Sequence, residues 1–296
     1  MPRRGTPAFA ALVIVSLLMA TIGSGSAQGA PQDGPDVLPR GGREIFPAYR
    51  VVAFCGAPQH RNLGALGIGS PDDAAKRLRR QARPYAAAGR PIMPAFQLIA
   101  TIALAGRGSD GKYRLRQPER VIQRYLDAAR RARAILVLDV QPGQADFMDE
   151  VRALRRWLLE PDVSLALDPE WSMRRGERPG SRLGHTTAGK INQVSAYLAH
   201  IVRRRELPQK LLLVHQFSES MIRNRSRIVQ RPGIAMTINV DGVGSRAAKR
   251  NTYRRFAFPG DPVFDGFKLF YEEDTNLMRP GDVLALRPRP DFVVYE

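Results

Sequence analysis

Eight short apolar runs alternate with amphipathic segments along this chain, a pattern that predicts an α/β protein with a parallel sheet. Eight strands in a chain of this length favour a closed TIM-type (β/α)8 barrel over an open doubly wound sheet. No G-x-G-x-x-G follows the first strand, which also disfavours a dinucleotide-binding sheet. The expected strands are 50–56, 92–98, 134–140, 163–168, 210–216, 234–240, 266–272 and 291–295.

Helical patterns fill most of the connections between these strands. Three of them begin with helix-start signals: Asp72-Asp73, Thr186-Thr187 and Ser218-Glu219. The last strand runs to the end of the sequence, and 275–290 is rich in proline, so we expect an incomplete final helix. The expected helices are 72–88, 118–132, 146–159, 187–206, 219–230 and 246–256.

The N-terminus has the order of a secretory signal peptide: Arg3-Arg4, an apolar run, and then small residues up to Ala27. We expect a signal peptide at 1–27, a flexible leader at 28–43, and one barrel domain at 44–296. An uncleaved anchor is the alternative, although the apolar run is short for a membrane span. No cysteine lies directly after the apolar run, so a lipobox is excluded. The predicted location is secreted, or in the periplasm or cell envelope, with no membrane span after cleavage.

The formal charge of +18 raises the question of an anionic partner. Of the 46 basic residues only six are lysine, and the arginines scatter over helix faces without the interleaved aromatics that stack nucleic-acid bases. We therefore predict no nucleic-acid binding, but a carbohydrate or an anionic envelope polymer as partner, and a monomer. Cys55 is the only cysteine, lies in an apolar run, and is expected to be a buried, inert thiol.

The most informative segment is 163–171, where an apolar strand ends in Asp168, Pro169, Glu170 and Trp171. Alternate strand residues share a face, which sets Asp168 and Glu170 roughly 6.5–7 Å apart on the same side. Carboxylates at the tip of a hydrophobic strand are costly unless they are paired, bind a cation or line a wet cleft. The sequence therefore predicts a polar site at the end of the fourth strand.

Other strands also end in polar side chains, and the C-terminal strand ends of a barrel meet at one face. In the fifth strand, either His215 or Gln216 points inward, but not both. Glu273 is the alternative to Glu272 at the end of the seventh strand. The expected substrate-binding residues are Asp139, Gln141, Trp171, His215, Gln216, Asn239, Asp241, Tyr271 and Glu273.

Two carboxyl groups facing each other across a sugar are what glycoside hydrolysis requires. The fourth and seventh strands supply such a pair in Glu170 and Glu272, with Asp168 to raise a pKa and with Trp171 and Tyr271 to stack on sugar rings. The hypothesis is a glycoside hydrolase-like enzyme with Glu170 as acid, Glu272 as nucleophile or base, Asp168 as the third catalytic residue, and no cofactor.

At these positions the chain resembles barrel glycoside hydrolases with an acid/base on strand four and a nucleophile on strand seven. That group usually has Asn before the strand-four Glu, where this chain has Pro169. The pair Asp168 and Glu170 is also similar to the acids spaced two apart in chitinase-like barrels. The segments LVLDVQPG, LALDPEW, LLVHQF and GFKLFYEED resemble a group of secreted bacterial barrel proteins of unassigned activity.

Two other hypotheses remain open at this point. Asp139, Asp168, Glu170, His215 and Asp241 are oxygen and nitrogen donors that fit a Mg²⁺- or Ca²⁺-dependent hydrolase. The four histidines form no HxH or HExxH spacing, which disfavours zinc. Alternatively the barrel binds a glycan or an envelope partner without catalysis.

Overall fold

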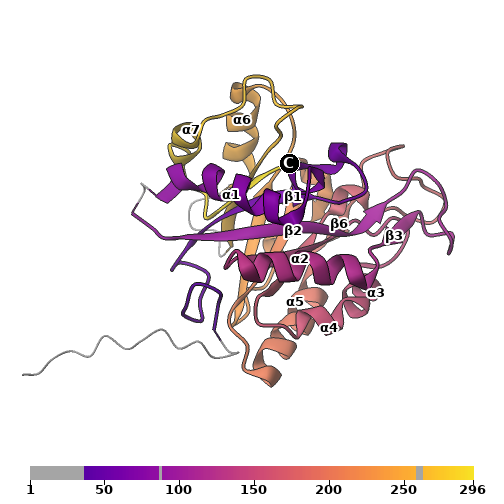
Figure 1. Ribbon diagram of the computed structural model, residues 1–296. Coiled ribbons are helices and arrows are strands. Elements are labelled where there is room, and N and C mark those ends of the chain that lie inside the picture. The colour runs from indigo at the N-terminus through magenta and orange to yellow at the C-terminus, as the bar shows by residue number, and fades with distance from the viewer. Residues whose placement is uncertain (1–36, 87–88, 258–262) are drawn as a thin grey trace, which may run out of the picture. The chain divides into compact units, whose positions relative to one another are not determined.

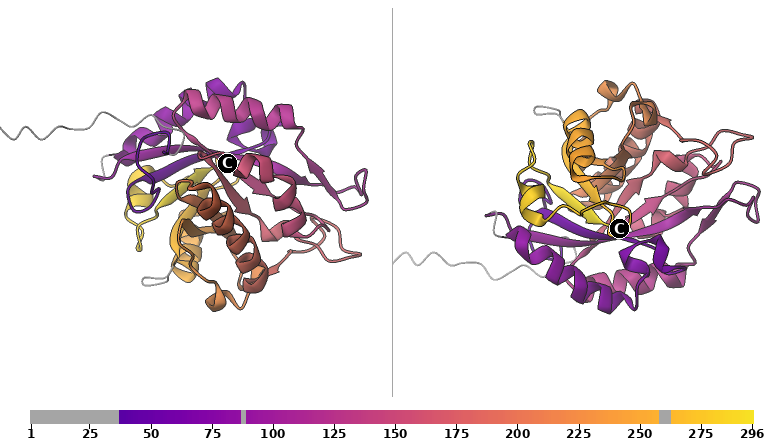
Figure 2. Two further views of the ribbon diagram at one scale, coloured as in Figure 1. Left: turned by 90° about the horizontal axis from the view of Figure 1, so that it is seen from below. Right: turned by 90° about the horizontal axis from the view of Figure 1, so that it is seen from above.

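Eight parallel strands close into a barrel in the computed structural model, which describes residues 37–86, 89–257 and 263–296 (Figure 1). The strand order is β1-β11-β10-β9-β7-β5-β4-β2, and pairing of β1 with β2 completes the ring. The TIM-type barrel predicted from the sequence is therefore confirmed. Helices from the first third of the chain cover one side of the strands, and helices from the second half cover the opposite side (Figure 2).

The barrel strands follow the predicted apolar runs closely. They are β1 Arg50–Gly56, β2 Ile92–Ala103, β4 Ile135–Val140, β5 Val163–Leu167, β7 Lys210–Gln216, β9 Ile234–Val240, β10 Phe264–Leu269 and β11 Phe292–Tyr295. The α-helices are α1 Pro71–Ala86, α2 Glu119–Arg131, α3 Phe147–Ala153, α4 Arg155–Leu158, α5 Ala188–Arg205, α6 Arg246–Phe256 and α7 Pro280–Leu284. Outside the ring, β3 Arg114–Arg116 pairs antiparallel with the end of β2, and the short strands β6 Thr186–Thr187 and β8 Ile222–Arg223 pair with each other.

The helix predicted at 219–230 is wrong. This segment forms two 3-10 turns, Glu219–Met221 and Arg225–Arg227, on either side of β8. Asn224 has a left-handed backbone with φ of 56°, which interrupts a right-handed helix. Pairing of Ile222 with Thr186 further favours extended backbone here. In contrast, Thr187 caps α5 as predicted, because its hydroxyl accepts a hydrogen bond from the Lys190 N–H at 3.2 Å.

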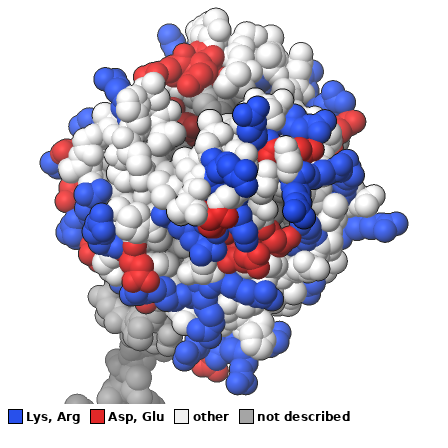
Figure 3. Space-filling model, turned by 90° about the vertical axis from the view of Figure 1, so that its right-hand side faces the viewer, with Lys and Arg blue, Asp and Glu red and all other residues white. Residues whose placement is uncertain are grey.

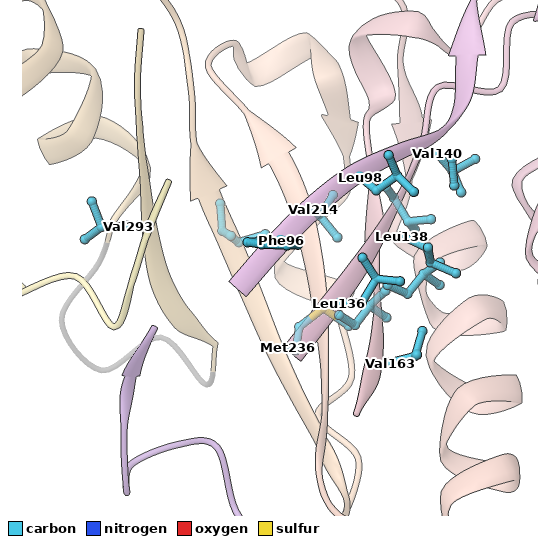
Figure 4. Packing of buried hydrophobic residues seen from close by; sticks show 14 of the residues in the cluster. Phe96, Leu98, Leu136, Leu138, Val140, Val163, Val214, Met236 and Val293 are labelled. Atoms are coloured by element: carbon cyan, nitrogen blue, oxygen red, sulfur yellow. The ribbon is translucent and has the colours of Figure 1, made fainter. Parts of the chain in front are cut away.

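Alternation along each strand divides the core into two layers. Outward-facing side chains pack beneath the helices, among them Leu98, Leu136, Leu138 and Val140 from β2 and β4 (Figure 4). Inward-facing side chains form a second cluster that fills the barrel interior. Its strand members include Val51, Ala53, Met93, Ala95, Ile135, Val137, Ala166, Leu211, Leu213, Ala235, Phe292 and Val294. The inner layer is mostly apolar up to the C-terminal strand ends, with Ser164 and Thr237 as its buried hydroxyl-bearing members below that level. Ionisable inward-facing side chains gather at the C-terminal ends.

Lys210 is a fully buried cation at the opposite end of the barrel, where β7 begins. Its Nζ donates to the carbonyl oxygens of Glu160 at 2.7 Å and Val163 at 2.6 Å. Burial lowers the pKa of Lys210 to about 7. Between this value and the usual one near 10.4, the folded protein binds fewer protons than the unfolded chain, so its stability rises with pH over that interval.

Replacing Lys210 with methionine is expected to remove this pH dependence. The free energy of unfolding of the wild type minus that of Lys210→Met should increase by about 4 kcal/mol from pH 7 to pH 10. Urea denaturation at pH 7, 8.5 and 10 measures both proteins, and titration of the other groups cancels in the difference. A difference that stays constant over this range would contradict a depressed pKa for Lys210.

The described residues belong to one unit, Asp33–Glu296. The predicted signal peptide and the leader up to residue 36 lie outside the described residues. Residues 37–43 are described, and Leu38 among them is buried. Within the described part of the chain, none of the helices combines the length and the apolar character needed to cross a bilayer.

Candidate active site at the C-terminal end of the barrel

A ring of polar side chains replaces the apolar inner layer at the C-terminal strand ends. Each comes from an inward-facing strand position or from the residue just beyond it. Its members are Gln97 on β2, Asp139 on β4, Asp168 after β5, His215 on β7, Asn239 and Asp241 on and after β9, Lys268 on β10 and Glu296 after β11. All except Glu296 are buried. The ring brings together Asp139, Asp168, His215, Asn239 and Asp241 from the set predicted from the sequence.

Five ionisable side chains of this ring form a chain of alternating charge across the barrel. His215 Nε2 lies 3.3 Å from Asp139 Oδ2, and His215 Nδ1 lies 2.8 Å from Asp241 Oδ2. Lys268 Nζ lies 3.4 Å from Asp241 Oδ2 and 2.6 Å from Glu296 Oε2. Gln97 supports one end, since its Nε2 donates to Asp139 Oδ2 at 2.7 Å. Each charge is thus compensated by a neighbour from another strand.

The pairing fixes the protonation states in the chain. Burial opposes the charge of His215, but the Asp139 carboxylate outweighs burial and raises the pKa of His215 well above its usual value, so the imidazole of His215 is protonated. Burial likewise opposes ionisation of Asp139 and Asp241. The positive charges of His215 and Lys268 nevertheless hold the pKa of both carboxyls below the usual range.

Lys268 occupies the inward-facing position of the seventh barrel strand. Burial acts against its charge, but Asp241 and Glu296 raise the pKa of Lys268 well above its usual value. It is therefore a fixed cation and not a nucleophile. The sequence hypothesis omitted Lys268, and the one signal for it was a lysine inside the otherwise apolar run Phe267 to Phe270.

Asp168 and Glu170 differ from the other acids because their pKa values are raised. Asp168 is buried after β5, and burial followed by the negative charges of Asp139 and Glu170 raises its pKa to about 8. Glu170 lies in the 3-10 turn Pro169–Trp171 and is partly exposed. Burial and the charge of Asp241 raise the pKa of Glu170. The end of the fourth strand therefore holds two carboxyl groups with raised pKa values, next to carboxyl groups whose pKa values are lowered.

Several buried polar atoms in this ring have no hydrogen-bond partner among the residues that the structure describes. They are Gln97 Oε1, Asp139 Oδ1, Asp168 Oδ1, Asn239 Nδ2 and Asn239 Oδ1. Asn239 lies against Gly266 of β10, where a Cβ would come within 2.9 Å of its Oδ1. Buried polar groups are normally satisfied, so this concentration at one end of the barrel indicates groups that hydrogen-bond to water or to a polar ligand.

Seven of the predicted residues are not members of the ring: Gln141, Glu170, Trp171, Gln216, Tyr271, Glu272 and Glu273. Gln141 and Gln216 brace the backbone or a neighbouring side chain: Gln141 Oε1 accepts from the Ala103 N–H at 3.1 Å, and Gln216 Oε1 accepts from Arg225 at 3.1 Å. Glu272 and Glu273 lie on an exposed turn after β10.

The turn lies beyond the end of β10 because β10 begins and ends earlier in the sequence than the predicted strand 266–272. β10 ends at Leu269, not at 272, so the predicted strand end lies within the turn. Tyr271 on the turn is 40% exposed and stacks on Tyr295 with ring centroids 5.3 Å apart. A small surface hollow beside the ring is lined by Arg61, Ile68, Tyr271, Glu272, Glu273 and Glu296. Trp171, half-buried, directly follows Glu170.

Lys249 of α6 connects the two loops on this side of the site. Its Nζ donates to the carbonyl oxygens of Gly242 at 2.5 Å and Lys268 at 2.7 Å, and lies 3.3 Å from Asp274 Oδ2. The same ammonium lies over the rings of Phe267 and Phe270. One buried cation thus holds the loop after β9 against the end of β10 and the turn that follows it.

The face of the molecule that carries these strand ends has acidic atoms set back among uncharged side chains, with many basic side chains around them (Figure 3). In the part of the chain that the structure describes, no three His, Cys, Asp or Glu side chains are grouped in a way that could hold a metal ion. The sequence matches no known protein family and no curated protein.

Proposed function

We propose that this protein is a glycoside hydrolase-like enzyme that acts on carbohydrate of the cell envelope or the environment. The observation that carries the proposal is the pair Asp168 and Glu170, two carboxyl groups with raised pKa values at the end of the fourth barrel strand. A raised pKa suits a carboxyl group to proton donation, because the protonated form persists to higher pH. The predicted signal peptide at 1–27 supports a site of action outside the cytoplasm.

In the proposed reaction Glu170 donates its proton to the glycosidic oxygen, and the bond from that oxygen to the sugar carbon breaks. Positive charge then develops on the sugar, as in the oxocarbenium-like transition state of glycosidases. A water molecule adds to the same sugar carbon and gives a proton to the Glu170 carboxylate, which restores the acid. Asp241 supplies fixed negative charge near Glu170, since its lowered pKa makes it a weak base but a stable carboxylate. Lys268 and His215 hold Asp241 in place on both sides.

Sugar hydroxyls both donate and accept hydrogen bonds, which matches the unpartnered atoms of Gln97, Asp139, Asp168 and Asn239. Tyr271, which is 40% exposed, offers an aromatic surface beside the ring for a neighbouring sugar unit. These features support a carbohydrate as the ligand of the site.

The proposal is tested by incubating the purified protein with neutral and acidic polysaccharides and assaying new reducing ends. Release of reducing ends, with one anomer formed first as observed by NMR, is the expected result. If the protein binds a glycan but cleaves none of the polysaccharides, the enzymatic activity is contradicted and a glycan-binding function takes its place.

A second measurement tests whether Asp168 holds a proton in the folded protein. Because its folded pKa is about 8 and the unfolded value is near 4, the folded state binds more protons between these values and loses stability as pH rises. Asp168→Asn lacks this titration. Its free energy of unfolding minus that of the wild type should therefore increase by about 4 kcal/mol from pH 5 to pH 8.

The matched control is Asp127→Asn, which changes an exposed aspartate of α2. For this variant the difference from the wild type should stay nearly constant over the same pH range. Equal pH dependence in the two variants would show that Asp168 is ionised in the folded protein from pH 5 to pH 8, which contradicts a raised pKa.

A further inference from the structure

The loop between β5 and α5 carries a cluster of basic side chains at the rim of the site. Arg174 Nη2 lies 3.2 Å from His185 Nε2. The short strand pair places Arg223 of β8 opposite Thr187, two residues beyond His185. We call Arg174, Arg182, His185 and Arg223 the basic rim.

Positive charge in the basic rim exceeds the negative charge that accompanies it. Glu177 pairs with Arg182 at 2.7 Å. Within the described residues, neither Arg174 nor Arg223 forms an ion pair with a carboxylate. His185 accepts the hydrogen bond from Arg174, and burial together with the charges of Arg223 and Arg174 lowers the pKa of His185, which favours the neutral imidazole. The positive charge of the basic rim is therefore carried by its arginines, and a bound anion would supply the partner that Arg174 and Arg223 lack among the described residues.

The basic rim is attached directly to the turn that carries Glu170. The Gly184 N–H donates to the Glu170 carbonyl oxygen at 2.7 Å, and the His185 N–H donates to the Ser172 carbonyl oxygen at 3.3 Å. A Cβ at position 184 would lie 2.4 Å from the Glu170 oxygen, so only glycine permits this approach. The cluster therefore lies beside the proposed acid, at the same end of the barrel.

Charge is segregated between the rim and the interior of the site. Asp139, Asp241 and Glu296 outnumber the two cations His215 and Lys268 in the interior. An anionic group is thus disfavoured inside the barrel and favoured at the rim. The planar guanidinium of arginine suits a carboxylate or phosphate, which it binds through two parallel hydrogen bonds.

We propose that the basic rim binds an oxyanion substituent of the glycan, a carboxylate or a phosphate, while an uncharged sugar unit occupies the site at Glu170. The substrate class is then an acidic glycan. This inference rests on the proposed function for its substrate but makes a separate prediction about binding.

Two matched pairs of polymers test it by titration calorimetry at low salt. The carboxylate pair is polygalacturonate and its carboxyl-reduced derivative; the phosphate pair is phosphorylated dextran and dextran. We expect the full-length protein to bind at least one acidic polymer about tenfold more tightly than its neutral counterpart, with the preference weakening in 0.5 M NaCl. The double variant Arg174→Gln/Arg223→Gln should lose the preference and keep its affinity for the neutral polymer.

The control is Arg204→Gln/Arg205→Gln, which removes the same charge from the exposed end of α5. Equal affinity for acidic and neutral polymers in both pairs would overturn the inference, as would an equal loss in the control variant. Preferential binding of an acidic polymer without cleavage would support anion binding at the basic rim and contradict the proposed enzymatic activity. Cleavage of acidic and neutral glycans with equal efficiency would support the enzymatic activity and contradict anion binding at the basic rim.

Discussion

Replacing Glu170 with glutamine is expected to lower turnover of a glycan by about 10²- to 10⁴-fold, the range that a positioned acid contributes. The amide has the shape of the acid but has no proton to give to the leaving oxygen. Since Glu170 is partly exposed and its raised pKa disfavours the charged form, a neutral isostere should fold normally. The loss should therefore fall on kcat with little change in Tm.

Release of reducing ends by Glu170→Gln and by Glu44→Gln provides the comparison. Glu44 is exposed and precedes β1, away from the C-terminal strand ends, so the same chemical change there should leave turnover intact. Full activity of Glu170→Gln would end its assignment as the acid. Glu272→Gln belongs in the same experiment, because a comparable loss there would restore the carboxyl pair expected from the sequence.

Replacing Lys268 with methionine is expected to destabilise the fold by about 3–5 kcal/mol, the usual cost of removing one partner from a buried ion pair. Two acids lose their cation at once, since Lys268 contacts both Asp241 and Glu296. The uncompensated charge lies at the centre of the polar ring. We therefore expect Lys268→Met to unfold at a lower urea concentration than the wild type.

Lys190→Met is the control for this variant, because Lys190 pairs with Asp146 on the exposed surface and such pairs contribute less than about 1 kcal/mol. Adding Asp241→Asn to Lys268→Met should recover part of the loss, which a double-mutant cycle would measure as coupling. An additive result would mean that Asp241 does not depend on Lys268.

The barrel could be predicted because its strands are continuous apolar runs, and these signals are local. Alternation in β7 limited the inward position to His215 or Gln216, and only the fold decides between them. The predicted strand 266–272 extends beyond the end of β10 because Phe270 and Tyr271 prolong the apolar run past Leu269. That shift is why Glu272 was expected at the strand end.

The missing members of the site illustrate a different limit. Lys268 acquires its importance from Asp241 and Glu296, which come from other strands of the barrel. In the sequence it is a single lysine, and an isolated lysine in a strand carries no information on its partners. The raised pKa of Asp168 likewise depends on Asp139, which is distant in the sequence.

The loops around the site differ in how well they should tolerate insertions and deletions, and the contacts of Lys249 account for the difference. The loops on the side of β9 and β10 share one buried ammonium, so an insertion in either of them would disturb both. The loop between β5 and α5 is joined to the rest of the barrel near its two ends and by one hydrogen bond from Gln144 to the Glu177 carbonyl oxygen. Gly176 and Gly180, on either side of Glu177, have open space around them. Length changes in that loop would move Arg174 and Arg182 of the basic rim while sparing the architecture that holds the acids.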